Sequence, residues 1–151
     1  MKNLVLLVVL VLSSPLIADE GHNHEAAVEA APQGGTLRDA PPFKAEITIE
    51  GETVKLTVYD QKLKVVKYDA ESLTGDIRYP RGFEPKEQKL VFKKVKLDKP
   101  ITIKDVGVIT ERYEGTVKGI SKPGLHRYDL HINLAVGGKK AMADFGIDNI
   151  N

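Results

Sequence analysis

The sequence contains no cysteine, and its net charge is close to zero. Without cysteine the chain forms no disulfide bond and carries no lipid on an N-terminal cysteine, so the hydrophobic core alone must stabilise the fold. Lys and Arg number 22 against 21 Asp and Glu. This balance argues against nucleic acid or an anionic membrane surface as the main partner.

Recognisable catalytic motifs are missing as well. No serine lies in a nucleophile-elbow motif, and the glycines occur one or two at a time at expected turns rather than in a phosphate-binding loop. We therefore expect a protein that is not an enzyme and that uses no organic cofactor.

The one long apolar run lies at the N-terminus. Leu4 to Leu12 is uninterrupted, Lys2 precedes it, and a Ser-Ser-Pro break followed by Ala18 ends it. This layout is typical of a secretory signal peptide, whereas a transmembrane helix normally needs about 20 apolar residues. Residues 1–18 are therefore expected to be a cleaved signal peptide. The mature chain would be periplasmic or secreted and would have no membrane span.

Two segments follow the expected signal peptide. Residues 19–42 are rich in Ala, Glu, Gly and Pro and hold few large apolar side chains, so we expect a flexible, His-containing leader and linker. Residues 43–151 are long enough to bury a core and are expected to form a single domain.

Apolar and polar residues alternate through much of this domain. Between Phe43 and Tyr59, two alternating runs flank Gly51 and Glu52, which predicts a β-hairpin with one apolar face. Further alternating runs, with turn signals about 8–12 residues apart, predict about eight to nine strands and no helix. The best fit is an all-β, two-sheet antiparallel sandwich of immunoglobulin-like type. A small closed barrel is the alternative that periodicity leaves open.

Lysine predominates over acidic residues between Lys86 and Lys104. We interpret this stretch as an edge strand that charge protects against aggregation, and a docking surface for an acidic partner is the alternative. Pro100 is expected to break the strand. Within residues 101–109 the apolar side chains change from odd to even positions, which predicts a bulge or two separate strands around Lys104 and Asp105.

Candidate metal ligands are concentrated directly after the expected cleavage site, in residues 21–25. Imidazoles and carboxylates on a segment without regular structure can surround a borderline divalent cation. We expect His22, His24 and Glu25 to bind a divalent transition metal, zinc or copper(II), with neighbouring carboxylates and water completing the shell. The alternative is a solvated polar leader.

The other two histidines are expected to be ordinary surface or edge residues. His126 lies at the start of a long predicted strand, just after a turn, whereas His131 points outward with Arg127 and Asp129. His126 and His131 have opposite parity and cannot share one face of a regular strand, so we do not expect them to form a site together.

Three short segments, residues 32–35, 43–47 and 54–60, resemble a pattern in small exported bacterial proteins. That pattern reads Pro-His-Gly-Gly, aromatic-x-x-Glu-apolar and Tyr-x-x-Asp. It also occurs near the N-terminus of periplasmic adaptor (membrane-fusion) subunits of heavy-metal efflux systems, where a His-rich leader often precedes it. Gln33 stands where that family has His. The resemblance implies periplasmic metal homeostasis and a partner in an efflux system or another envelope protein.

These observations predict a non-enzymatic periplasmic protein that binds a transition-metal ion or serves metal homeostasis, in association with heavy-metal efflux. The alternative is a structural or interaction module that docks another cell-envelope protein.

Overall fold

The computed structural model describes residues 29–67, 72–120, 125, 127–136 and 139–148. The expected signal peptide and His22, His24, Glu25 and His126 lie outside these residues. The described part of the chain forms eight strands: β1 (Thr36–Ala40), β2 (Phe43–Glu50), β3 (Thr53–Tyr59), β4 (Ser72–Arg78), β5 (Glu87–Ile103), β6 (Gly107–Thr116), β7 (Arg127–Val136) and β8 (Lys139–Asp148). Within it, no helix is long and apolar enough to cross a membrane.

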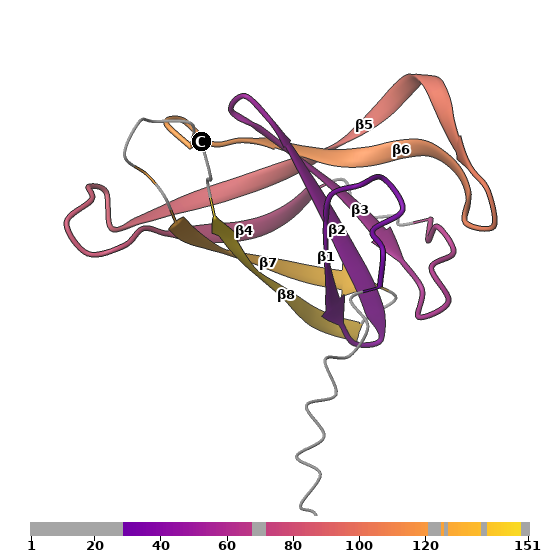
Figure 1. Ribbon diagram of the computed structural model, residues 1–151, viewed down its shortest axis with the longest axis horizontal. Coiled ribbons are helices and arrows are strands. Elements are labelled where there is room, and N and C mark those ends of the chain that lie inside the picture. Colours follow the sequence, from indigo (N-terminus) through magenta and orange to yellow (C-terminus); the bar gives the residue numbers. More distant parts are fainter. Residues whose placement is uncertain (1–28, 68–71, 121–124, 126, 137–138, 149–151) are drawn as a thin grey trace, which may run out of the picture.

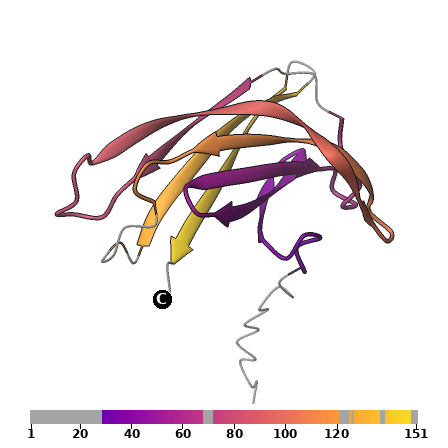
Figure 2. The same cartoon turned by 90° about the horizontal axis from the view of Figure 1, so that it is seen from above.

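All eight strands belong to one antiparallel sheet with the order β1-β2-β3-β6-β5-β4-β7-β8. The sheet curls until β1 and β8 lie close together, although no hydrogen-bonded ladder joins these two described strands (Figures 1 and 2). The predicted two-sheet immunoglobulin-like sandwich is therefore wrong, because the strands form a single, nearly closed barrel. Alternation shows which side of a strand is buried but not which strands pair, so it could not separate the two architectures.

The predicted hairpin between Phe43 and Tyr59 is confirmed as β2 and β3. Glu50 pairs with Thr53 at its closed end. Gly51 makes the turn with a φ of 59°, in the left-handed region that glycine adopts at low cost. The hairpin thus supplies two of the barrel strands, each with one face toward the core.

The barrel interior holds one hydrophobic core, and all eight strands contribute buried side chains to it. β1 contributes Ala40 and β6 contributes Tyr113, whereas each of the other strands contributes at least two. Its largest fully buried members include Tyr128, Phe92 and Phe145. Burial of a large apolar side chain stabilises a fold by about 1.5–3 kcal/mol, so this core can hold a chain without disulfides together.

β5 is the longest strand, with 17 residues, and it changes partners along its length. Its first part, as far as Lys93, pairs with β4, and from Lys93 to Ile103 it pairs with β6. In the strand order β5 lies between β6 and β4, so the prediction of an edge strand is wrong for the strand as a whole, although each half pairs with only one of these neighbours. The strand also continues past Pro100, where the register with β6 shifts between Lys96 and Ile101.

Of the two predicted alternatives around Lys104 and Asp105, a bulge or two separate strands, the structure has two strands. Residues 104–106 form a turn between β5 and β6, and Asp105 adopts a φ of 63°. The change of apolar phase in the sequence therefore marks a reversal of the chain direction.

β1 lies within residues 19–42, the segment expected to be leader and linker. The described residues that precede β1 contact the outer face of β2 and β3. This N-terminal stretch is the structural feature on which the candidate sites depend.

Candidate functional sites

A buried polar cluster lies on the outer face of β2 and β3, where strand alternation alone predicts exposure to solvent. Glu46 is 1% exposed, Thr57 is 5% exposed and Tyr59 is fully buried. These side chains are covered because the chain at Gln33 and Gly35 folds back across them. We call these five residues the N-terminal clasp.

The Glu46 carboxylate is the centre of the clasp. Its Oε1 accepts hydrogen bonds from the backbone N–H groups of Gln33 and Gly35, both at 2.9 Å. Its Oε2 accepts a hydrogen bond from the Tyr59 hydroxyl at 2.7 Å. The side-chain amide of Gln33 donates to the hydroxyl oxygens of Thr57, at 2.8 Å, and Tyr59, at 2.9 Å. A buried charge normally needs such partners, and hydrogen bonds to an ionised group are the stronger ones.

Two glycines allow the chain to reach Glu46. Gly34 has a φ of 75°, and its N–H donates to the carbonyl of Ala31 in a turn. Gly35 passes so close to β2 that an added Cβ would lie 2.2 Å from the carbonyl oxygen of Ile47. Glycine is therefore required at the two positions for different reasons. Gly34 adopts a left-handed backbone conformation, and Gly35 lies too close to the β2 backbone for a side chain.

The surroundings of Tyr59 keep its hydroxyl protonated. Burial raises the pKa of Tyr59 far above its ordinary value, and the adjacent Glu46 carboxylate raises it further. Tyr59 therefore remains a neutral donor to the carboxylate over the physiological pH range.

An ion pair extends the attachment of the chain toward the N-terminus. Lys44, on the outer face of β2, contacts the carboxylate of Glu29, and this hydrogen bond raises the pKa of the Lys44 ammonium group. The polypeptide is thus held to the barrel from Glu29 onward.

The clasp brings together residues from the three sequence segments 32–35, 43–47 and 54–60. Gln33, Glu46 and Tyr59 contact one another, and three donors occupy the Glu46 carboxylate. A cation at Glu46 would have to displace those donors, so the clasp is built to hold the chain rather than to hold a metal. Sequence reasoning missed its burial; the Gly-Gly pair ahead of the first strand was the available signal.

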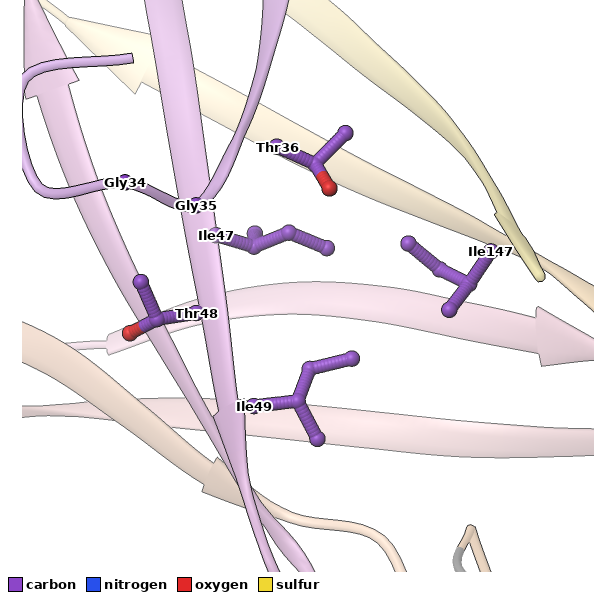
Figure 3. A pocket seen from close by; sticks show the side chains of 7 residues that line it. All are labelled: Gly34, Gly35, Thr36, Ile47, Thr48, Ile49 and Ile147. Carbon is purple, nitrogen blue, oxygen red and sulfur yellow. The ribbon is translucent and has the colours of Figure 1, made fainter. Parts of the chain in front are cut away.

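A pocket of about 320 Å³ lies where β1 and β2 face the end of β8, at the seam of the barrel. In Figure 3, Ile47 and Ile147 point toward each other across it, whereas Thr48 lies on the other side of β2. Small-molecule pockets usually measure about 300–1,000 Å³, so this one is at the lower limit. The described residues that line it include no titratable side chain.

His131 occupies the outer face of β7, so its predicted outward orientation is confirmed. Asp76 on β4 and Asp144 on β8 are its direct partners in the strand register. Its Nδ1 is hydrogen-bonded to Oδ1 of Asp144. The imidazole therefore lies in a row of side chains between two carboxylates.

Within the described ranges, no three His, Asp or Glu side chains converge on a common point where a metal ion could bind. The predicted ligands His22, His24 and Glu25 are outside these ranges, as is His126, so this result does not concern them.

Comparison with known proteins gives no family model, no curated protein and no solved structure that matches this chain. The class of protein is thus defined by its fold, an all-β chain with a single antiparallel sheet nearly closed into a barrel.

Proposed function

We propose that this protein is a non-enzymatic, exported barrel that binds a divalent transition metal through its N-terminal leader. The observation that carries the proposal is the sequence of residues 22–25, in which two imidazoles and a carboxylate stand within four positions. His22, His24 and Glu25 are the ligands, and Zn²⁺ and Cu²⁺ are the cations that such donors favour.

The clasp supports this role because it attaches the chain close to the ligands. Glu29, which pairs with Lys44, follows Glu25 by only four positions in the sequence. A short connection limits the volume that the ligand-bearing residues can explore, and so lowers the entropy lost when they close around a cation. The barrel acts as a support for the metal site.

The biological setting we propose is metal homeostasis in the cell envelope, with transfer of the ion to an efflux system or another envelope protein. Its support is the resemblance of residues 32–35, 43–47 and 54–60 to the efflux-related pattern. The competing view is a structural or interaction module that docks another envelope protein through a lysine-bearing edge or through its outer sheet face. Because β5 lies inside the strand order, the outer sheet face is the surface that this view would use.

Calorimetric titration of the chain from Asp19 onward with Zn²⁺ and Cu²⁺ tests the proposal. The tightest binding event should weaken at least about tenfold in the His22→Ala, His24→Ala double variant, because loss of a metal ligand or its support commonly costs that much. His126→Ala is the matched control and should leave this event unchanged. A double variant that binds as tightly as the unmodified chain would overturn the assignment of these ligands.

A further inference from the structure

We propose a second transition-metal site on the barrel itself, formed by His131 and Asp144 on the outer face of β7 and β8. It is independent of the leader site. His131 and Asp144 are direct cross-strand partners, and their side chains already touch through Nδ1 and Oδ1. The Asp144 side chain is 55% exposed and that of His131 is 22% exposed, so a hydrated cation can reach the pair.

The sheet holds the two donors at a suitable separation. Directly opposed residues on antiparallel strands have Cβ atoms about 4.5–5.5 Å apart. A tetrahedral Zn²⁺ with ligand bonds of about 2.0–2.2 Å places an imidazole nitrogen and a carboxylate oxygen about 3.4 Å apart. His131 and Asp144 reach that spacing by small side-chain rotations, and the paired backbones of β7 and β8 stay in place.

The charges around His131 favour a cation. Asp76 faces it from β4, on the opposite side from Asp144. The Asp76 Oδ2 atom is buried and has no hydrogen-bond partner among the described residues, although the Arg78 Nε lies 3.5 Å from it. The Arg78 side chain is 62% exposed, so water screens its charge. A divalent ion at His131 therefore gains attraction from two carboxylates.

The chemistry of the donors defines the class of ion. When the metal binds, it replaces the hydrogen bond between Nδ1 of His131 and Oδ1 of Asp144. A neutral imidazole then carries its ring proton on Nε2, and an imidazolium releases one proton to solvent. One imidazole and one carboxylate favour Cu²⁺ and Zn²⁺ over Mg²⁺, which prefers oxygen ligands and retains its water. With only two protein donors, water fills the remaining positions and the site is open to exchange.

The test uses the chain from Asp19 onward with His22→Ala and His24→Ala, so that the leader ligands are gone. Cu²⁺ titration followed by electron paramagnetic resonance should still show bound copper coupled to one imidazole nitrogen. Adding His131→Gln should abolish that signal, and adding Asp144→Asn should weaken binding at least about tenfold. Adding His126→Ala, the matched control, should change nothing.

A second measurement does not depend on substitution. In the unmodified chain, Cu²⁺ should broaden the backbone amide resonances of Asp76, His131 and Asp144, and Mg²⁺ should not. Absence of bound copper in the leader double variant, or binding that survives His131→Gln, would overturn the barrel site. Failure of the leader proposal gives a different result: copper binding that is lost when His131 is replaced and unchanged when His22 and His24 are replaced.

Discussion

Replacing Glu46 by alanine should destabilise the barrel more than any other single change to a charged residue on the outer face of β2. The substitution removes the acceptor for two backbone N–H groups and one phenol. Gln33 and Gly35 are half-buried, so their N–H groups can regain water. The Tyr59 hydroxyl is fully buried and cannot.

The magnitude follows from these three contacts. An unsatisfied buried hydroxyl costs about 1–3 kcal/mol, and each lost hydrogen bond to a charged acceptor costs a similar amount before rehydration. Relief from burying the carboxylate offsets part of this loss. We expect Glu46→Ala to lower the free energy of unfolding by about 3–4 kcal/mol. Glu46→Gln keeps one carbonyl acceptor, and should cost about 1–2 kcal/mol.

Urea unfolding followed by circular dichroism measures both values, provided that the dependence of the unfolding free energy on urea concentration is the same in the variants and the unmodified protein. Glu50→Ala is the matched control, since Glu50 lies on the same strand and face but is solvent-exposed and forms a surface ion pair with Lys55. Its loss should change stability little. Equal effects of Glu46→Ala and Glu50→Ala would refute the argument that the clasp stabilises the fold.

Two further predictions follow from the clasp and the core. Gly35→Ala should lower the free energy of unfolding by about 3 kcal/mol, because the new Cβ would clash with the β2 backbone. Gly34→Ala meets open space and should cost about 1 kcal/mol, because the residue has a positive φ. Urea unfolding of both variants measures these losses, and a larger loss for Gly34→Ala than for Gly35→Ala would contradict the reasoning. Burial raises the pKa of both Tyr59 and Tyr128, so above about pH 10 the unfolded chain releases protons that the folded chain retains. Stability should then fall as pH rises, by up to about 1.4 kcal/mol per pH unit for each tyrosine. Tyrosinate absorbance that shows every tyrosine ionising near pH 10 in the folded protein would be inconsistent with this.

Local structure was largely readable from the sequence, and long-range pairing was not. The alternation from Phe43 to Tyr59 gave the β2–β3 hairpin, and the change of phase near Asp105 gave the β5–β6 turn. Closure of the sheet depends on which strands pair with one another, and the two-residue alternation of side chains carries no information about strand pairing. The prediction of an edge strand between Lys86 and Lys104 is wrong for the same reason, because the local sequence does not show that β5 lies between β6 and β4.

The clasp shows a second limit. Alternation correctly places the Glu46 side chain on the other face of the sheet from those of Ala45 and Ile47. Glu46 is nevertheless buried, because residues distant in sequence cover it. A strand pattern reports on one sheet face at a time and cannot show that another segment covers the outer face. The parity of His131 was predictable, but its position between Asp76 and Asp144 required the register of three strands.

The central claim, that the leader binds a transition metal, is tested most directly by counting nitrogen ligands. With one equivalent of Cu²⁺ added to the chain from Asp19 onward, electron paramagnetic resonance should show coupling to two imidazole nitrogens, and this coupling should disappear when His22 and His24 are both replaced by alanine. A spectrum with only oxygen ligands, identical in the two proteins, would contradict the claim.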